Sequence, residues 1–396
     1  MDPIITSILD VDLYKISMLQ AYFHQYPSAK GRWVFKCRNE GVKLGFLCKD
    51  VKDQVRKLKN LELSKEEKVY LKSLGYFKDD FLNWFEEFRV RPSLVSITEN
   101  QSGQLEIEAE GLLIEVNILE VYILAIVNEL YFRHKNLQDD FYLNKMECDG
   151  MKTLRSKIDK LSCYPNLKFA EFGTRRRYSK EWQDKVIKTL VDECPNIIGT
   201  SNVYYAKKYG IKPIGTVAHE WTMSHLGLVD KIEQAQSRAL YVWQQEYDQA
   251  LGIALTDTFT SKAFFKDFKF PVARAYDGVR QDSGDPIVFG EDMISHYKSI
   301  GIDPRRKSII FSDGLNVNLS IEIWKHFVGR VGVSFGIGTN LTNDLYFEPL
   351  NIVMKLMNCN GVPVVKLSDN PGKAMGDKLM IEKVKRAYGV NDDIVF

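Results

Sequence analysis

The sequence predicts an α/β barrel preceded by a smaller α+β unit, and three observations lead to this prediction. In the second part of the chain, short apolar runs alternate with helical segments, which is typical of a parallel sheet. About seven or eight such units occur, enough for a sheet to close into a barrel. The chain has 396 residues, 45% of them hydrophobic and 27% charged, as in a soluble globular protein of about two or three domains.

The N-terminal unit mixes helical and strand patterns and carries no obvious chemistry of its own. Ser64 and Glu67 have the capping-box spacing that opens a helix. Apolar residues at helical or alternating spacing give the remaining elements. We expect helices at residues 10–26, 51–58, 79–88 and 120–132, and strands at residues 32–38, 94–98 and 104–109.

A charged helical segment at residues 145–161 separates this unit from the barrel pattern. We therefore expect an α+β N-terminal domain (1–135), an α/β barrel catalytic domain (136–370), and a C-terminal tail (371–396) packing on the N-terminal domain. The barrel strands are expected at residues 167–170, 196–198, 212–214, 252–255, 272–275, 308–311 and 331–335.

Each expected strand is followed by a small polar cluster. In a parallel barrel the carboxyl ends of the strands share one face, and active sites lie there. Packing alone would not collect Gly, Thr, Asp and Arg in all of these loops. The sequence therefore predicts a single site at this face.

Bulk charge and cysteine usage exclude several classes of function. The net charge is +2, from 54 basic and 52 acidic residues, which gives no support to a nucleic-acid or membrane-surface role. The six cysteines show no CxxC spacing, so we expect reduced thiols and no zinc site. The N-terminus lacks a basic signal-peptide region, and no apolar run is long enough to span a bilayer. We expect a cytoplasmic protein.

The stretch YDGVRQDSGDP (276–286) combines carboxylates with an arginine and ends in turn residues. Carboxylates such as Asp282 and the guanidinium of Arg280 are costly at the end of a buried strand unless something charged binds there. A divalent cation with a phosphorylated sugar would use both kinds of group. An Arg–Asp pair closing an ordinary turn is the alternative, and this stretch alone leaves both open.

Two later loops, SDGLN (312–316) and GIGTN (336–340), follow adjacent expected strands. Glycine lets backbone N–H groups approach a ligand closely, and a following helix N-terminus favours an anion. Two such loops after late strands match the phosphate site typical of barrels. Asn and Thr at these positions could equally be helix caps.

Two further strand ends carry candidate ligand contacts. Phe172 and Arg175 offer a stacking face and a cation for a flat anionic ring, although a core Phe with a surface Arg gives the same pattern. His219 follows another strand, where a histidine can be a general acid, an anion contact or a phosphoryl acceptor. A structural histidine is the alternative, and His225 nearby stays undecided. With Asp257 and Asp282 as metal carboxylates, the set suits bond cleavage at a sugar anomeric carbon.

These motifs together resemble the nicotinate phosphoribosyltransferase family. The resemblance runs in order through LDVDLYKISM, FAEFGTRRR, GTSNVYYA, GTVAHEW, YDGVRQDSGDP, FSDGLN, FGIGTN and KLSDNPGK. It implies an irregular α/β barrel with a smaller N-terminal domain. It also implies synthesis of nicotinate mononucleotide and pyrophosphate from nicotinate and phosphoribosyl pyrophosphate in NAD salvage, with ATP as co-substrate, Mg²⁺ as cofactor, and a homodimer.

The resemblance also implies residue roles. His219 would be phosphorylated by ATP, which would add fixed negative charge near the site. Phe172 would stack on the pyridine ring, with Tyr14 of a second subunit on its other face. Arg280 and Thr216 would hold nicotinate or its neighbourhood.

The remaining implied roles concern the sugar and the phosphates. Arg175 would meet phosphate, and Asp257 and Asp282 would hold the ribose and magnesium. The loops that would hold the 5′-phosphate contribute Gly314, Gly338 and Thr339.

Two alternative functions fit parts of the sequence. Nicotinamide or quinolinate could replace nicotinate on the same fold, but the GTSN stretch and His219 followed by Glu-Trp resemble the nicotinate group, and quinolinate would need more cations. A non-enzymatic phospho-ligand-binding barrel would be expected to lose the histidine or the carboxylates, and all are present.

Overall fold

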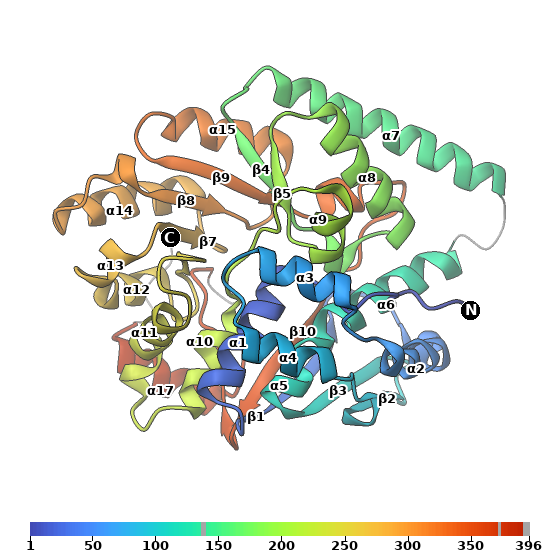
Figure 1. The fold of residues 1–396 in the computed structure, drawn as a ribbon, viewed down its shortest axis with the longest axis horizontal. Helices are drawn as coiled ribbons and strands as arrows, with labels where there is room; N and C mark the ends of the chain where they lie inside the picture. Colours follow the sequence, from blue (N-terminus) through green and yellow to red (C-terminus); the bar gives the residue numbers. More distant parts are fainter. Residues whose placement is uncertain (136–139, 371–373, 391–396) are drawn as a thin grey trace.

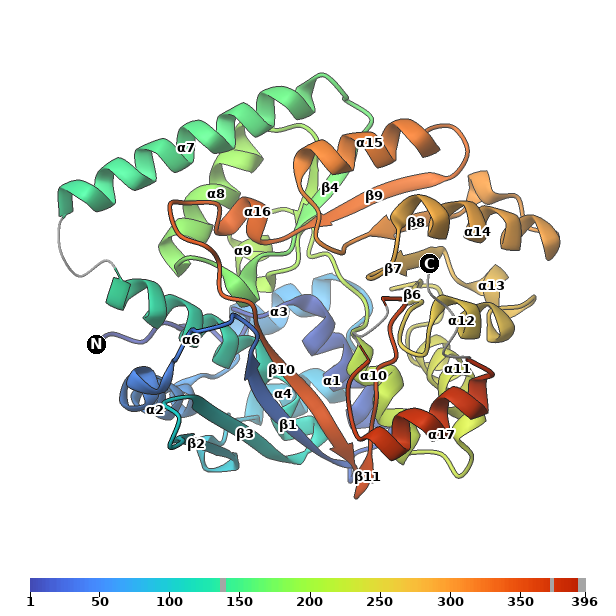
Figure 2. The same ribbon diagram turned by 180° about the vertical axis from the view of Figure 1, so that it is seen from behind.

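The protein is built around two sheets, shown in Figures 1 and 2. The structure, a computed structural model, describes residues 1–135, 140–370 and 374–390, without side chains for residues 140–142. One sheet has five strands in the order β11-β10-β1-β3-β2, and the other has six in the order β5-β4-β9-β8-β7-β6. The expected mixed α/β architecture with a separate N-terminal domain is confirmed.

The N-terminal domain matches the expected pattern closely. The predicted capping box is present, with Ser64 accepting from the Glu67 backbone N–H. Alternation in β1 buries Trp33 and Phe35, as a half-buried strand requires. The elements are α1 (Leu13–Gln25), β1 (Lys30–Cys37), α2 (Cys48–Lys57), α3 (Lys65–Ser73), α4 (Asp79–Glu87), β2 (Val95–Glu99), β3 (Leu105–Leu112), α5 (Leu113–Val116) and α6 (Leu119–Lys135).

The five-stranded antiparallel sheet is completed from the far end of the chain. β10 (Ile352–Cys359) pairs antiparallel with β1, and β11 (Val362–Pro363) pairs with β10. Part of the segment expected in the barrel domain therefore belongs to the N-terminal sheet. No sequence pattern marks this, because strand partners that are distant in sequence are chosen by tertiary packing.

The second sheet is wholly parallel and is covered by helices on its outer side (Figure 2). Its strands are β4 (Lys168–Glu171), β5 (Ile197–Thr200), β6 (Ile253–Leu255), β7 (Gly278–Gln281), β8 (Ser308–Phe311) and β9 (Gly332–Ile337). The helices of this part are α7 (Asp140–Ser162), α8 (Lys180–Glu193), α9 (Val203–Tyr209), α10 (His219–Ser224), α11 (Ala235–Tyr247), α12 (Ser261–Asp267), α13 (Val272–Ala275), α14 (Pro286–Ser299), α15 (Val317–Phe327) and α16 (Thr339–Thr342).

The barrel closes irregularly at one place. Residues 212–214, expected as a strand, contribute a single parallel bridge between Thr200 and Pro213. The Thr216 hydroxyl then donates to the Ile253 carbonyl at 3.0 Å, which links this segment to β6. Backbone hydrogen bonds thus join this segment to β5, and a side-chain hydrogen bond joins it to β6.

One predicted strand is wrong. Residues 272–275 form the short helix α13, and the strand at this point is β7, with the sequence GVRQ. Gly278 lets β7 approach β8, because a Cβ there would lie 2.1 Å from the Ser308 carbonyl oxygen. The sequence prediction looked for apolar runs and missed β7 because this strand contains polar residues. One of them, Arg280, lines the cavity.

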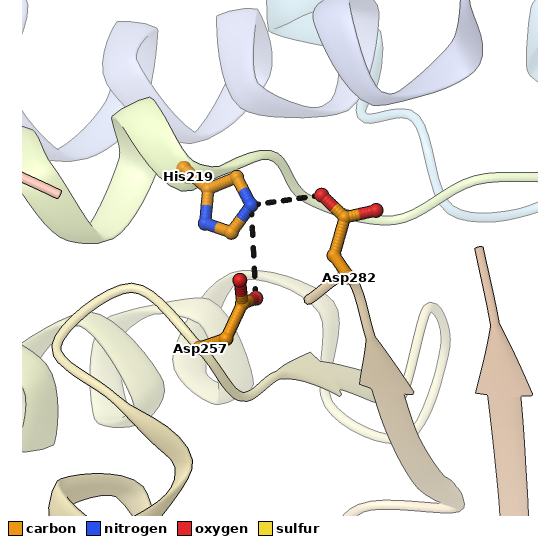
Figure 3. A group of neighbouring side chains, drawn as sticks. All are labelled: His219, Asp257 and Asp282. Carbon is orange, nitrogen blue, oxygen red and sulfur yellow. Dashed lines mark hydrogen bonds and ion pairs between the residues drawn. The ribbon is translucent and has the colours of Figure 1, made fainter. Parts of the chain in front are cut away.

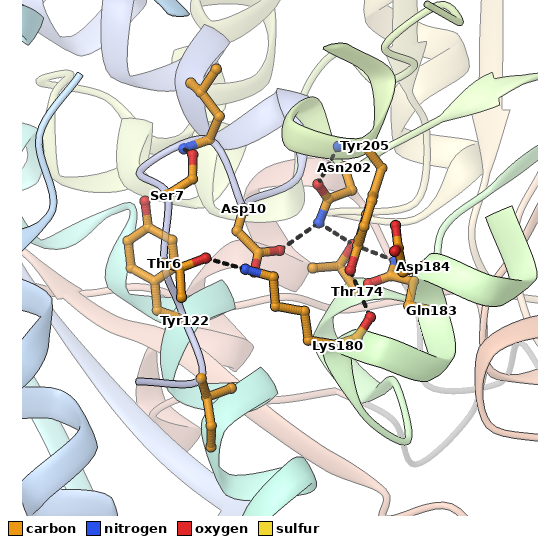
Figure 4. A network of polar contacts seen from close by, with 12 residues as sticks. Thr6, Ser7, Asp10, Tyr122, Thr174, Lys180, Gln183, Asp184, Asn202 and Tyr205 are labelled. Carbon is orange, nitrogen blue, oxygen red and sulfur yellow. Dashed lines mark hydrogen bonds and ion pairs between the residues drawn. The ribbon is translucent and has the colours of Figure 1, made fainter. Parts of the chain in front are cut away.

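A buried polar network fixes the N-terminal segment to the barrel (Figure 4). Arg177 donates to both carboxylate oxygens of Asp10, at 2.8 and 3.0 Å, and both side chains are fully buried. The Asn202 amide also donates to Asp10, at 2.8 Å, and to Thr174. The Leu13 N–H donates to the Ser201 carbonyl at 2.7 Å. These bonds place the start of α1 beside the carboxyl ends of β4 and β5.

The described part of the C-terminal tail, α17 (Lys378–Tyr388), differs from the expectation of packing on the N-terminal domain. It lies beside α11 (Figure 2). The Tyr388 hydroxyl donates to the Ile232 carbonyl and accepts from the Gln236 N–H, and Lys266 donates to the Tyr388 carbonyl at 2.6 Å. The rest of the tail, residues 371–373 and 391–396, lies outside the described residues, as does the end of the KLSDNPGK motif.

In the part of the chain that the structure describes, every helix is too short or too polar to cross a membrane. All six cysteines are free thiols, as expected.

Candidate active site

A cavity of about 700 Å³ opens at the carboxyl ends of the parallel strands and reaches the N-terminal sheet. It brings together strand ends that are far apart in sequence, as the barrel interpretation predicted. The predicted site residues on its wall are Tyr14, Phe172, Arg175, His219, Arg280, Asp282, Gly314, Gly338 and Thr339.

Two predicted residues lie off this wall. The Thr216 hydroxyl is engaged by the Ile253 carbonyl, so its position closes the barrel. Asp257 is fully buried directly behind His219. The geometry therefore separates these two residues from the cavity surface.

The imidazole of His219 lies between two carboxylates at the start of α10 (Figure 3). Its Nε2 is 3.0 Å from Asp282 Oδ2 and 3.7 Å from Asp257 Oδ1. Its Nδ1 is 3.1 Å from the hydroxyl of Thr258, which is itself buried. The histidine is thus held from both ring nitrogens, and Nε2 faces the charged groups.

Lys366 completes this cluster, and the sequence interpretation gave it no role. Its Nζ lies 2.8 Å from His219 Nε2 and 2.8 Å from Asp257 Oδ2. An ammonium can only donate and an ionised carboxylate can only accept, so the Lys366 contact of Nε2 calls for the imidazole proton on Nδ1, whereas the Asp282 contact calls for it on Nε2. Burial and the Lys366 charge lower the pKa of His219, which favours the neutral ring.

The two carboxylates are held in their ionised forms. Burial raises the pKa of Asp257, but His219 and Lys366 offset this, and the pKa is lowered overall. For Asp282, Arg280 and His219 likewise outweigh burial, so its pKa falls well below the usual range. Ser283 donates to Asp257 at 2.6 Å, and Ser312 donates to Asp282 at 2.6 Å.

These carboxylates fit a divalent cation. His219, Asp257 and Asp282 each offer a ligand atom, and these atoms lie within 4.8 Å of one another. Asp257 Oδ1 is buried and accepts no hydrogen bond from the described residues. Ionised oxygen ligands, one of them unsatisfied, suit Mg²⁺, which binds through one or two carboxylates together with substrate phosphates and water.

An aromatic wall faces this polar cluster. Phe172 follows β4 and is half-buried. Gly336 and Gly338 make room for it, because a Cβ at Gly336 would lie 3.2 Å from its ring, and one at Gly338 would lie 3.2 Å from its carbonyl oxygen. Tyr14, predicted to reach in from a second subunit, lines the cavity from the same chain and is only 2% exposed.

Arg175 is 42% exposed and lies over the Tyr14 ring, 5.6 Å from its centroid. Its Nε is 3.5 Å from Asp12, and its Nη1 is 3.7 Å from Glu120. Both contacts are longer than hydrogen bonds, so the guanidinium keeps donors for an anion in the cavity.

The two glycine loops differ in their geometry. Gly314 has φ +59°, a left-handed conformation that favours glycine, and it leaves open space above its Cα. Asn316 caps α15 by accepting from the Leu319 N–H at 2.9 Å, so its capping interpretation is confirmed. Gly338 precedes the short helix α16 and lies against Phe172.

His225, left undecided by the sequence, has a structural environment. It is fully buried, and its Nδ1 is bonded to the Trp221 carbonyl at 2.7 Å. Burial lowers its pKa to about 4. His225 is therefore a neutral core histidine.

Sequence reasoning also missed basic residues on the N-terminal side of the cavity. Arg38, at the end of β1, and Lys355, on β10, line it together with Arg176. Burial and nearby cations lower the pKa of Lys355 to about 7. Only the pairing of β1 with β10 brings Arg38 and Lys355 to the site, so no local motif could have revealed these two cations.

Known proteins resemble this chain along its whole length. Its sequence matches the nicotinate phosphoribosyltransferase family over residues 167–392 and the N-terminal domain of that family over residues 9–128. It is 41% identical over 394 residues to nicotinate phosphoribosyltransferase of Burkholderia mallei, covering 98% of this chain and 97% of the relative. It is 42% identical over 400 residues to that of Chromobacterium violaceum, covering 98% of each.

Solved structures give the same result. The crystal structure of nicotinate phosphoribosyltransferase from Vibrio cholerae superposes with a TM-score of 0.93 at 38% identity, covering 99% of this chain and 95% of that one. The crystal structure from Porphyromonas gingivalis superposes with a TM-score of 0.92 at 37% identity, covering 98% and 100%.

Proposed function

The chain belongs to the nicotinate phosphoribosyltransferase family, and we propose from this membership that it transfers phosphoribose to nicotinate in NAD salvage. The observation that carries the proposal is one cavity with three kinds of wall: an aromatic wall, a cluster of carboxylates, and glycine loops. These suit a flat ring, a developing positive charge at a sugar carbon, and phosphate groups.

In the proposed reaction, the pyridine nitrogen of nicotinate attacks the anomeric carbon of phosphoribosyl pyrophosphate. The bond from that carbon to the pyrophosphate oxygen breaks, and its electron pair leaves with pyrophosphate. Phe172 and Tyr14 hold the ring, and Arg175 and Arg280 contact anionic groups. The ionised Asp282 carboxylate lies where it can stabilise an oxocarbenium-like transition state.

Asp257 and Asp282 would hold Mg²⁺, which when bound neutralises charge on the pyrophosphate leaving group. The chain's own residues prepare this position. Ser283 and Ser312 orient the two carboxylates by hydrogen bonds. The Lys366 ammonium forms an ion pair with Asp257 and so offsets part of the negative charge of the two carboxylates.

ATP acts as a co-substrate through His219. In the tautomer with the proton on Nδ1, facing Thr258, Nε2 carries an electron pair. Nε2 then attacks the γ-phosphorus of ATP, and the bond from that phosphorus to the ADP oxygen breaks. The phosphohistidine adds fixed negative charge inside the cavity and changes its affinity for substrates and products. Attack of water then returns the imidazole and releases phosphate once per turnover.

Two other functions remain as outcomes of the test. The same cavity could take nicotinamide or quinolinate, or the barrel could bind a phospho-ligand without catalysis. The cluster of Asp257, Asp282 and His219 supports an enzyme, because a binding module has no need of three neighbouring ionisable groups at one cavity.

The direct experiment measures pyrophosphate release from phosphoribosyl pyrophosphate with nicotinate, nicotinamide and quinolinate, each with and without MgATP. We expect turnover with nicotinate and stimulation by MgATP. Turnover with another base would overturn the ring assignment. Silence with all three would overturn the enzymatic proposal.

A matched pair of variants tests the carboxylate role. Asp282→Asn should lower kcat with nicotinate by roughly 10²-fold or more, the usual effect of removing one electrostatic group from an active site. Asp303→Asn, in an exposed pair with Arg305, should leave kcat unchanged. Equal rates for the two variants would remove Asp282 from the mechanism.

We also propose that the protein is a cytoplasmic homodimer, as the family resemblance implies. Light scattering coupled to size-exclusion chromatography measures the mass directly. Because Tyr14 lines the cavity from its own chain, the single chain already supplies both aromatic residues of this wall.

A further inference from the structure

Beneath the Tyr14 side of the cavity lies a fully buried lysine. Lys15 has 0% side-chain exposure, and its Nζ contacts Glu120 Oε2 at 2.5 Å and Glu220 Oε1. The Asn117 side-chain oxygen accepts from the same ammonium at 3.3 Å. Lysines are almost never fully buried unless they are paired, so this position depends on its carboxylates.

The partners of Lys15 come from different parts of the chain and reach the cavity. Lys15 lies on α1, Glu120 on α6, and Glu220 on α10, directly after His219. Both glutamates line the cavity, whereas Lys15 lies behind them. The ammonium is also 5.6 Å from the centroid of the Tyr14 ring. Tyr14 is itself buried, so this side of the ammonium is shielded from solvent.

The charges at this end of the cavity leave a net negative balance. Lys15 and Arg175 are the cations, and Asp12, Glu120 and Glu220 are the carboxylates in contact with them. With all five ionised, this charged group carries one net negative charge. Without Lys15 it would carry two, on the wall where an anionic ring is proposed to bind.

A purely structural ion cluster offers little stability, because well-packed apolar residues of similar volume often do as well or better. Two glutamates that line a ligand cavity, with a buried lysine behind them, point instead to control of the cavity's charge. We propose that Lys15 is a specificity-determining residue that offsets Glu120 and Glu220, so that the cavity accepts an anionic pyridine carboxylate beside Tyr14. This inference rests on the proposed function, and it assigns Lys15 an electrostatic effect without contact to the substrate.

Three variants test the inference by changing the net charge in steps. Lys15→Met removes the cation and gives a charge of minus two. The double variant Lys15→Met with Glu220→Gln restores minus one, and Glu220→Gln alone gives zero. The KM for nicotinate and kcat are measured for each at saturating phosphoribosyl pyrophosphate, with circular dichroism and thermal melting to establish folding.

The KM for nicotinate should follow the charge. We expect a rise on the order of tenfold in Lys15→Met, the effect of one uncompensated charge about 12 Å away at an effective permittivity of about 20. The double variant should return to within about threefold of the wild type, and Glu220→Gln alone should not raise KM. The effect should appear in KM more than in kcat, because the charge acts on ground-state binding as well as on the transition state.

Other patterns overturn the inference. If the double variant has a KM for nicotinate as high as that of Lys15→Met, the effect of Lys15 comes from packing and not from charge. If Lys15→Met does not fold, Glu220→Gln carries the test, and a tenfold rise in its KM would contradict the inference. A wild-type protein without nicotinate-dependent turnover would instead refute the proposed function, so the two failures are distinguishable.

Discussion

Replacing Asp10 by Asn should destabilise the protein far more than a matched change at its surface. The carboxylate of Asp10 receives two bonds from Arg177, at 2.8 and 3.0 Å, and both side chains are fully buried. Asn keeps the shape but not the charge, and it leaves a buried guanidinium uncompensated. Loss of one partner of such a pair costs about 3–5 kcal/mol of unfolding free energy.

Asp303→Asn provides the control. Asp303 also contacts its arginine, Arg305, through both carboxylate oxygens, but Arg305 is 73% exposed. Asn can still accept the Arg305 backbone N–H that Asp303 now accepts. An exposed pair contributes about 1 kcal/mol or less, so this variant should be close to the wild type.

Urea unfolding at pH 7, followed by circular dichroism, gives the free energies for both variants. The Asp10 effect should also depend on pH. Burial raises its pKa, but Arg177, Lys180 and Asn202 lower it more, so the folded pKa lies below the unfolded value of about 3.9. The stability that the ionised Asp10 contributes is therefore present above about pH 4 and is lost as pH falls through the folded pKa. The difference in unfolding free energy between the wild type and Asp10→Asn should then become smaller.

Equal, small losses of unfolding free energy in Asp10→Asn and Asp303→Asn would refute this reasoning. They would mean that breaking the buried Asp10–Arg177 pair costs no more than breaking an exposed pair. A gap between Asp10→Asn and the wild type that stays constant below pH 4 would contradict the pH argument separately.

Three further predictions concern the site. His219→Ala should abolish stimulation by MgATP while leaving some basal transfer, and full stimulation in this variant would exclude the phosphohistidine. Gly336→Ala should raise the KM for nicotinate by roughly tenfold, a loss of about 1.4 kcal/mol, because its Cβ would lie 3.2 Å from the Phe172 ring; an unchanged KM would show that Phe172 does not hold the base. Lys366→Met should raise the pKa of His219, because the ammonium that lowers it is gone while Asp257 remains; the proton resonances of the ring, titrated by NMR, measure this, and a lower pKa would contradict the assigned contact.

Much of the fold follows from local patterns. The capping box at Ser64, the alternation in β1, and the apolar runs of β4, β6, β8 and β9 each have a physical cause within a few residues. Because parallel strands end at one face, the polar residues after them had to meet. That reasoning predicted Phe172, His219 and Asp282 on one cavity without any knowledge of their distances.

Local patterns failed where one segment depends on a distant one. β7 is a strand because it packs against β8, although its residues are polar. Residues 352–363 join the N-terminal sheet because β1 offers them an edge. The family resemblance implied that Thr216 holds nicotinate or its neighbourhood, but its hydroxyl donates to the Ile253 carbonyl where the barrel closes.

The sequence by itself determined which chemical groups the site would have, since glycine loops, carboxylates and a histidine after strands are written in the order of residues. Only the tertiary structure decided how those groups are charged and oriented. Lys366 contacts Nε2 of His219 and lowers the pKa of that ring, and Lys15 lies behind the Tyr14 wall with two carboxylates. Both lysines act through burial and through partners distant in sequence, and neither property exists until the chain is folded.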